Sequence, residues 1–292
     1  MILSNIAGLW ESAWPAGVTM LSLGTLFAIV LLIASIKLKV VVDEKITQVH
    51  ESLPNVDCGA CGFAGCGAYA KAVVSDPELL GACAPGGAET SEAIAKILNL
   101  QISGSGSPVR PIVRCRAHTA DRTSYAEYAG IETCTAANAQ AIVQACKFGC
   151  MGFGDCLAAC RFDAITITDG LSTIDYEKCT GCGACAKTCP RNLIVMVPFS
   201  QENMLTVGCS SRENGKTTRS MCKTGCIGCG LCSKQTDIFV TENNLAKLDY
   251  EKYLPNEATE TATEKCPTGV IVYRGKSAPA PRAAGQKPAV KK

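Results

Sequence analysis

The feature that most constrains this chain is the segment KCTGCGACAKTCP near its middle. Its cysteines, Cys179, Cys182, Cys185 and Cys189, have the spacing C-x2-C-x2-C-x3-C, and a proline follows. A 4Fe–4S cube needs four thiolates at its corners, and one tight loop can supply three of them, so the fourth cysteine of such a run reaches a neighbouring cube. The segment therefore predicts two iron–sulfur clusters and a second ligand loop elsewhere in the chain.

Two further segments are repeats of one another. CKFGCMGFGDCLAACRFD, which begins at Cys146, aligns without a gap with CKTGCIGCGLCSKQTDIF, which begins at Cys222. The first repeat has Phe153 where the second has Cys229. Because the first repeat lacks this middle cysteine, we expect Cys146 to supply the missing ligand.

The second repeat lacks the cysteine that would cross to a neighbouring cluster. Thr236 stands in place of Cys160, and after Tyr250 the chain reads EKYLPNEATETATEKCPTG, without the triad that a crossing cysteine would serve. These two losses make sense only together, so they favour crossed ligation. They leave ligands for one cluster in the second repeat.

Crossed ligation predicts three clusters in this part of the chain, each with three ligands from one region and a fourth from farther along. The predicted sets are Cys146, Cys150 and Cys156 with Cys189; Cys179, Cys182 and Cys185 with Cys160; and Cys226, Cys229 and Cys232 with Cys266, for which Cys222 is an alternative ligand.

A fourth cluster is predicted nearer the amino terminus. The segment VDCGACGFAGC places Cys58, Cys61 and Cys66 in one glycine-rich loop, and Cys83 follows 17 residues later. Glycines let backbone amides approach sulfur, and such donors tune the potential of a cluster. A zinc knuckle is the alternative, but zinc sites usually pair two C-x2-C loops, whereas a single loop here carries three sulfurs.

Four cysteines fall outside these sets: Cys115, Cys134, Cys209 and Cys222. Cys134 precedes Cys146 by about the same distance as Cys209 precedes Cys222, which indicates related positions in the two repeats. We expect all four to be buried as small apolar side chains. The alternative is a fifth cluster, for which they would have to converge from two modules.

Composition narrows the ways in which such a chain can be stabilised. The chain has 292 residues, 20 cysteines and only 5% aromatic residues, so small modules of this kind need metal or cross-links to be stable. Disulfides require an oxidising compartment, and no Lys or Arg precedes Lys37 to form the basic region of a signal peptide. A net charge of +2 without a basic stripe argues against a nucleic-acid partner. His50 and His118 lie far apart, and neither a catalytic constellation nor a separate mononuclear metal site is recognised.

Residues 18–36 carry no charge. At about 1.5 Å per residue they span roughly 28 Å, close to the thickness of the hydrocarbon layer of a membrane. Trp10 and Trp14 precede this run, and Lys37 and Lys39 follow it. The positive-inside rule then places the amino terminus outside and the rest of the chain in the cytoplasm. The run predicts a single-pass anchor in the inner or cytoplasmic membrane, in contact with lipid; a buried core helix is the alternative.

Together these features predict an α+β chain with a single N-terminal transmembrane helix, a small helical 4Fe–4S module and then ferredoxin-like 4Fe–4S modules, with a hairpin turn near Asp169 and Gly170. The expected divisions are 1–36 (outer amino terminus and anchor), 37–100 (stalk and first iron–sulfur module), 101–110 (linker), 111–200 (two-cluster ferredoxin-like module), 201–275 (one-cluster ferredoxin-like repeat) and 276–292 (disordered tail).

The order of these parts resembles the B subunits of the Rnf/Rsx electron transport complexes, the ion-translocating ferredoxin:NAD+ oxidoreductases. LPNVDCGACGFAGCGAYAKAV is similar to the amino-terminal iron–sulfur motif of that family, and CKFGCMGFGDCLAACRFDAI and KCTGCGACAKTCP resemble its ferredoxin pair. The resemblance covers nearly everything before the tail. The second repeat departs from it by keeping ligands for one cluster, which leaves the wiring of that module open.

The resemblance implies an electron-transfer subunit of a translocating oxidoreductase complex, with no substrate chemistry of its own. It implies electron exchange with soluble ferredoxin and transfer towards membrane, flavin-bearing and NAD-binding subunits of a complex that moves Na+ or H+. The residues show no nicotinamide site, flavin attachment or ion path, since the anchor has no ionisable residue at its centre. The alternatives are an iron–sulfur subunit of another membrane oxidoreductase, such as a hydrogenase, and a zinc-stabilised membrane-tethered scaffold.

Overall fold

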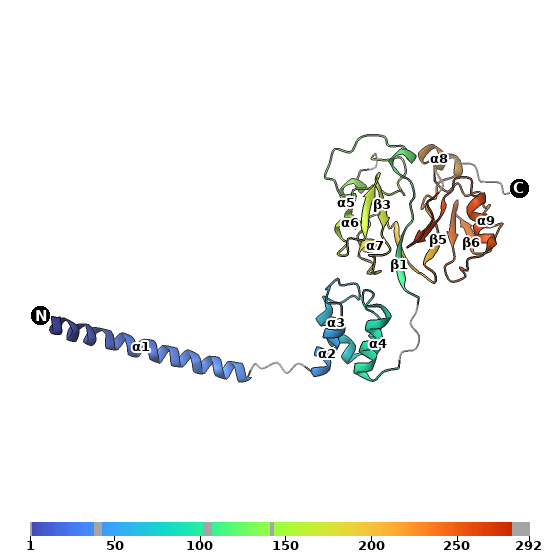
Figure 1. Cartoon of the computed structure of the whole chain (residues 1–292). Coiled ribbons are helices and arrows are strands. Elements are labelled where there is room, and N and C mark those ends of the chain that lie inside the picture. Colours follow the sequence, from blue (N-terminus) through green and yellow to red (C-terminus); the bar gives the residue numbers. More distant parts are fainter. Residues whose placement is uncertain (1, 38–42, 102–106, 141–142, 282–292) are drawn as a thin grey trace. The chain divides into compact units, whose positions relative to one another are not determined.

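The structure is a computed structural model, and it describes residues 2–37, 43–101, 107–140 and 143–281. It divides into two compact units, Met1–Thr47 and Gln48–Lys292, and each is described by itself. Helices and strands both occur, which agrees with the expected α+β class (Figure 1). Residues 38–42 of the expected stalk, 102–106 of the expected linker and 282–292 of the expected tail lie outside the described residues.

The first unit consists mainly of helix α1 (Ile2–Lys37). Its segment Gly17–Lys37 has 21 residues and a mean hydropathy of 2.3, and among the described residues it is the one helix long and apolar enough to cross a membrane. Large apolar side chains of this segment, such as Phe27 and Leu31, are exposed. A core helix would bury them, so the segment is a candidate membrane helix, in agreement with the uncharged run 18–36.

The part of the chain that follows is helical. Val49, Tyr69 and Ile94 form the centre of its core. The Tyr69 hydroxyl donates a hydrogen bond of 3.0 Å to the Leu79 carbonyl, which holds the chain before Cys83 against the helix that carries Tyr69. The elements of this helical module are α2 (Glu44–Ser52), α3 (Cys66–Ser75), the 3-10 helix η1 (Pro77–Leu79) and α4 (Gly87–Leu98).

The rest of the second unit contains two β modules with the same strand order. In the first β module (residues 109–198), an outer antiparallel pair encloses a hairpin, and the second β module (residues 203–275) repeats this pattern. The first has β1 (Val109–Val113) paired with β4 (Ile194–Pro198), and β2 (Ile165–Thr168) paired with β3 (Leu171–Ile174). The second has β5 (Asn203–Val207) paired with β8 (Ile271–Gly275), and β6 (Phe239–Glu242) paired with β7 (Leu245–Leu248).

Both hairpins turn through two residues with positive φ. Asp169 and Gly170 have φ values of 47° and 74°, and Asn243 and Asn244 have values of 49° and 61°. This combination makes type I′ turns, whose twist matches that of paired strands. The turn predicted near Asp169 and Gly170 is therefore confirmed.

A glycine of each cysteine-rich loop packs directly on the turn of its hairpin. A Cβ at Gly152 would collide with the Gly170 carbonyl, and a Cβ at Gly228 would lie 2.8 Å from the Asn244 Cα. Gly152 and Gly228 occupy the same position in the aligned repeats. The absence of a side chain thus lets the loop and the hairpin meet in the same way in both modules.

Short helices complete the two β modules, and one apolar core runs through both of them. Ile112 and Leu193 of the first module belong to the same buried cluster as Leu205 and Phe239 of the second. The helical segments are η2 (Thr119–Asp121), α5 (Cys134–Asn138), α6 (Asp155–Ala158), α7 (Ala184–Thr188), α8 (Gly215–Met221) and α9 (Glu257–Lys265).

The second β module has an aromatic ring where the first has a cysteine. The sequence DYEKY at 249–253 follows β7 as DYEKC at 175–179 follows β3. Tyr253 therefore takes the place of Cys179, and its side chain is 3% exposed. Helix α9 follows, with the Asn256 side chain accepting a 2.9 Å hydrogen bond from the Thr259 amide at its start. Side chains thus fill the part of the second β module in which the sequence predicts no second cluster.

Thr236 likewise replaces Cys160 in a local hydrogen bond. In the first module the Ala164 amide donates to the Cys160 sulfur at 3.4 Å. In the second, the Ile238 amide donates to the Thr236 hydroxyl at 3.5 Å. The two amides are equivalent, since both residues also accept a backbone hydrogen bond from an aspartate after the hairpin. The Thr236 hydroxyl therefore accepts the hydrogen bond that the Cys160 sulfur accepts in the first module.

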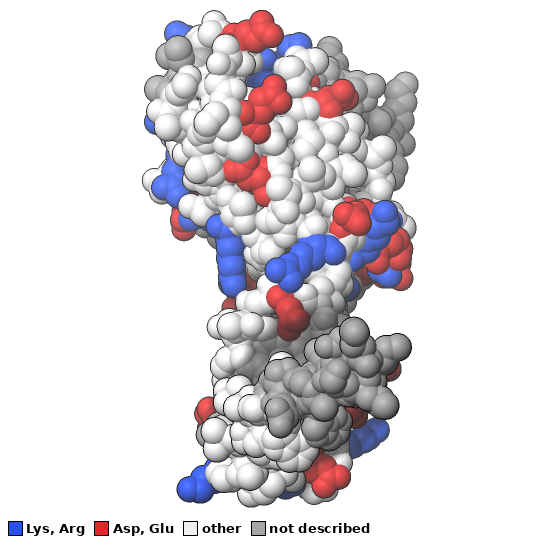
Figure 2. All heavy atoms as spheres, turned by 90° about the vertical axis from the view of Figure 1, so that its left-hand side faces the viewer, with Lys and Arg blue, Asp and Glu red and all other residues white. Residues whose placement is uncertain are grey.

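Charged side chains of both signs are interspersed on the face shown in Figure 2, with broad uncharged areas between them. The described residues in this view thus show charges of both signs and no extended stripe of a single sign.

Replacing Tyr253 by Ala should destabilise the second β module by about 3 kcal/mol or more, because it leaves a cavity of aromatic size in the core. The measurement is the midpoint of thermal unfolding, with Tyr125→Ala as the matched control, since the Tyr125 side chain is 67% exposed. Equal midpoints for the two variants would contradict a space-filling role for Tyr253.

Candidate functional site

The cysteines of this chain line five separate pockets. Each pocket has four cysteines in its wall, and no cysteine lines more than one of them. The pockets enclose between about 260 and about 440 Å³, part of it open to solvent. All 20 cysteines are free thiols in the structure. They are therefore grouped by fours.

The amino-terminal pocket brings together Cys58, Cys61, Cys66 and Cys83, the set that the sequence predicts. The loop ends where α3 begins, and the Asp57 carboxylate accepts a hydrogen bond of 2.6 Å from the Cys66 amide. This bond fixes the loop against the start of α3.

A second pocket brings together Cys160, Cys179, Cys182 and Cys185, again the expected set. Cys160 follows α6, and Cys185 lies in α7, so the two short helices meet at this pocket. The wall contains the crossing cysteine of one loop and the triad of the other. The lining therefore agrees with crossed ligation, for which these four residues stay the predicted ligands.

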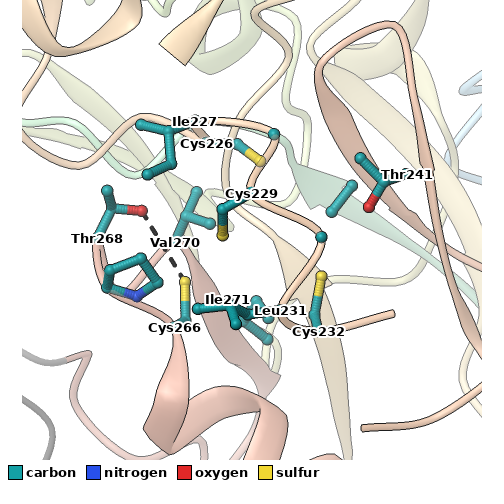
Figure 3. A pocket seen from close by; sticks show the side chains of 14 residues that line it. Cys226, Ile227, Cys229, Leu231, Cys232, Thr241, Cys266, Thr268, Val270 and Ile271 are labelled. Carbon is teal, nitrogen blue, oxygen red and sulfur yellow. Dashed lines mark hydrogen bonds between the residues drawn. The ribbon is translucent and has the colours of Figure 1, made fainter. Parts of the chain in front are cut away.

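The pocket of the second β module is lined by Cys226, Cys229, Cys232 and Cys266, which is also the expected set (Figure 3). Cys266 follows α9, and its sulfur lies 3.9 Å from the Thr268 hydroxyl. Cys229 is exposed, whereas the other three are buried. This pocket thus reaches the surface at Cys229.

The fourth pocket differs from the expected grouping at one position. Its cysteines are Cys134, Cys150, Cys156 and Cys189. Cys146, which we expected here, lines another pocket. Cys134, which we expected to be a buried apolar residue, takes its place.

Asp155 explains why Cys134 lies at this pocket. The Asp155 carboxylate accepts hydrogen bonds from the Cys134 amide at 2.6 Å, the Thr135 amide at 2.9 Å and the Thr135 hydroxyl at 2.7 Å. Burial opposes ionisation, but the hydrogen bonds from Thr135 and Cys134 lower the pKa of Asp155 below its ordinary value. Since Asp155 begins α6 and precedes Cys156, it ties the start of α5 to this loop.

Phe153 supports the same arrangement. Its ring lies 5.1 Å from that of Tyr128, centroid to centroid, and packs on a small buried cluster of Cys134, Ala137 and Met151. In the second repeat Cys229 stands at this position. The ring thus holds the segment that brings a cysteine from elsewhere to replace the missing one.

The fifth pocket is lined by Cys115, Cys146, Cys209 and Cys222. Three of these belong to the quartet left over by the sequence, and Cys146 replaces Cys134. Cys115 lies two residues after β1 and Cys209 two residues after β5. Strand position therefore relates Cys209 to Cys115, rather than to Cys134 as the sequence spacing suggested.

Burial keeps several of these thiols neutral. It raises the pKa of Cys150 to about 11 and those of Cys185 and Cys209 to about 12. A thiol must lose its proton to bind metal. Metal binding at these pockets therefore releases protons, and the cationic metal compensates the buried negative charge.

The donor sets fit 4Fe–4S clusters better than single metal ions. Among the described residues, no group of three or more His, Cys, Asp or Glu side chains is placed to hold one metal ion. A tetrahedral zinc site draws its sulfurs close to a single centre, whereas a cubane carries them at its separate corners. The described pockets have four cysteines in each wall, and no three of them are placed to share one ion, which matches the second case.

Family models match two of the cysteine-rich regions. A model described as "Putative Fe-S cluster" matches residues 53–85, and one described as "4Fe-4S binding domain" matches residues 172–195. The first contains the amino-terminal pocket cysteines, and the second contains the run Cys179–Cys189. Both regions therefore bind iron–sulfur clusters, and the cluster of the second region is of the 4Fe–4S type.

Curated relatives are similar over most of the chain. One is 37% identical over 259 residues, which cover 87% of this chain and 77% of the relative, and is named as the B subunit of the Na(+)-translocating ferredoxin:NAD(+) oxidoreductase complex of Acetobacterium woodii. Another is 38% identical over 265 residues (87% and 90%) and is the proton-translocating counterpart from Clostridium ljungdahlii. A third, 34% identical over 235 residues (79% and 88%), is the B subunit of an ion-translocating oxidoreductase complex from Methanosarcina acetivorans.

Replacing Asp155 by Ala should release the start of α5 and lower the stability of the Cys134 pocket by about 1–3 kcal/mol, because three hydrogen bonds to a charged carboxylate are lost. The readout is the temperature at which iron–sulfur absorbance is lost. Asp237→Ala is the control, since Asp237 is exposed beside a cysteine loop. A midpoint for Asp155→Ala that matches the control would show that this carboxylate does not hold Cys134 in place.

Proposed function

The chain belongs to the B subunits of the ion-translocating ferredoxin:NAD(+) oxidoreductase complexes, and we propose that it relays electrons between soluble ferredoxin and the other subunits. It is an iron–sulfur electron-transfer subunit of an oxidoreductase complex. The observation that carries the relay role is the grouping of its cysteines by fours around separate pockets within one unit.

We propose that both β modules are ferredoxin-like and that the helical module before them is a separate iron–sulfur module. The common strand order and the short helices at the cysteine loops support this arrangement. The matched 4Fe–4S binding region, residues 172–195, runs from β3 through the α7 loop into β4.

Four pockets account for four clusters, with one change from the expected ligands. Each cluster, when bound, supplies reversible one-electron chemistry. The sets are Cys58, Cys61, Cys66 and Cys83; Cys134, Cys150, Cys156 and Cys189; Cys160, Cys179, Cys182 and Cys185; and Cys226, Cys229, Cys232 and Cys266.

The protein tunes these sites through burial and through donors to sulfur. The Ala164 amide donates to the Cys160 sulfur and the Leu193 amide to the Cys189 sulfur, both at 3.4 Å. Each donor lies four residues after its cysteine, so the two crossing ligands have equivalent surroundings. Hydrogen bonds to sulfur are one lever on cluster potential.

Helix α1 is proposed to anchor the subunit in the cytoplasmic membrane, with the amino terminus outside and the iron–sulfur modules in the cytoplasm. Lys37 in its last turn and the uncharged run before it support this orientation. No ionisable residue lies between Gly17 and Ile36, so this span offers no ion path of its own. The movement of Na+ or H+ is therefore assigned to partner subunits.

The full-length protein, purified with detergent without oxygen, should be brown, and reduced ferredoxin should bleach its iron–sulfur absorbance. Deleting residues 1–42 should make it soluble without loss of iron, since the pockets lie after this segment. An iron-free or zinc-loaded protein that is properly folded would contradict the proposal, as would an iron-loaded protein that reduced ferredoxin does not reduce.

Crossed ligation predicts which cluster each crossing cysteine serves. Cys160→Ala should remove the paramagnetic resonance signal of the cluster at the Cys179 triad and leave that of the Cys134 pocket. Cys189→Ala is the matched variant and should have the opposite effect, because Cys189 lines the other pocket. Equal loss of both signals in either variant would show that the ligands are not crossed.

A further inference from the structure

The pocket of Cys115, Cys146, Cys209 and Cys222 is the one of the five that both β modules build. The cysteines of each other pocket come from a single module. The fifth pocket takes Cys115 and Cys146 from the first β module and Cys209 and Cys222 from its repeat.

The four cysteines form two equivalent pairs. Cys115 and Cys209 each lie two residues after the first strand of their module. Cys146 and Cys222 are the first cysteines of the two aligned segments. The repeats thus meet face to face, and each contributes the same two positions. Four thiols that were only filling core space would have no reason to converge in this symmetric way.

Backbone contacts fix this junction. Arg122 and Cys222 form an antiparallel bridge, the Thr123 amide donates to the Met221 carbonyl at 2.9 Å, and the Lys223 amide donates to the Asp121 carbonyl at 2.8 Å. These backbone contacts hold Cys222 against the first β module.

Side chains near the other three cysteines add to the junction. The Ser210 hydroxyl donates to the Arg114 carbonyl at 3.1 Å, beside Cys115 and Cys209. Next to Cys146, Lys147 forms an ion pair of 3.1 Å with Glu213. The cysteines of both modules are therefore held in place by the polypeptide itself.

The residues around these four cysteines favour negatively charged sulfur ligands. Cys115 and Cys209 are buried, and Cys146 and Cys222 are half-buried. The Ser211 amide donates to the Cys209 sulfur at 3.4 Å. Arg114 and Arg122 lie in the wall, whereas the wall contains no carboxylate and no imidazole. The Arg122 guanidinium, which acts on Cys115, and the amide donors stabilise negative charge on these sulfurs.

We propose that Cys115, Cys146, Cys209 and Cys222 bind a fifth 4Fe–4S cluster, which joins the two β modules. The inference rests on the proposed function for the nature of the cluster. The cysteines of this site share loops with cysteines of other pockets. Cys146 and Cys150 lie in one short loop of the first β module, and Cys222 and Cys226 lie in the equivalent loop of the second. The fifth site therefore lies one loop away from a cluster pocket of each module and connects them.

The experiment counts iron and sulfide in the full-length protein purified without oxygen, together with native mass spectrometry of the wild type. Five clusters require about twenty irons per chain, and four require about sixteen. The variants are Cys209→Ala, Cys115→Ala/Cys209→Ala and, as the matched control, Cys134→Ala/Cys209→Ala.

Cys209→Ala should lose about four irons, and adding Cys115→Ala should lose no more, because both residues serve one cluster. Adding Cys134→Ala instead should raise the loss to about eight irons, because Cys134 lines a different pocket.

A wild type with about sixteen irons would overturn the fifth cluster and leave the proposed function intact, whether the four thiols are free, form disulfides or bind zinc. A wild type without iron would overturn the proposed function itself. If a variant fails to fold, the cluster count of the wild type by native mass spectrometry still decides between four clusters and five.

Discussion

Cysteine sulfur bound to iron is the interaction on which the second unit depends. Its sheets are all two-stranded among the described residues, and such pairs are marginal when they stand alone. Cysteine sulfurs line the pockets of both β modules, beside the apolar core that the two modules share. Metal binding then contributes directly to the free energy of folding. The strands and short helices serve mainly to hold cysteines at the right places.

The two β modules show how one cluster can be lost and another kept. In the second, the buried ring of Tyr253 and the helix α9 occupy the space beside the lost triad, and Thr236 keeps the local hydrogen bond of the crossing cysteine. In the first, Phe153 replaces a ligand, and its ring packs on the segment that brings Cys134 to the pocket. Substitution at one position is thus compensated by packing at another.

Much of this could be predicted from the sequence, because regular cysteine spacing encodes a local loop. The grouping of Cys160 with the Cys179 triad follows from the crossed ligation that the C-x2-C-x2-C-x3-C run implies. The candidate membrane helix and the hairpin at Asp169 and Gly170 follow from short-range patterns. These patterns depend on residues close in the chain, where backbone geometry leaves few arrangements.

The exchange of Cys134 and Cys146 could not be predicted in the same way. Both precede the same loop, and the choice depends on the Asp155 hydrogen bonds, which join segments 20 and 21 residues apart. The relation of Cys115 to Cys209 was hidden as well, because it follows from strand ends and not from cysteine spacing. A signal was present, since each lies two residues after the valine that ends a strand, Val113 or Val207.

Hydrogen exchange before and after removal of iron tests most directly whether the fold depends on its metal. We expect the amides of β1 to β8 to be protected in the iron-loaded protein and to lose that protection together when a chelator removes the iron without oxygen. An iron-free protein that keeps the protection of these strands would contradict this dependence, since the fold would then stand without its metal.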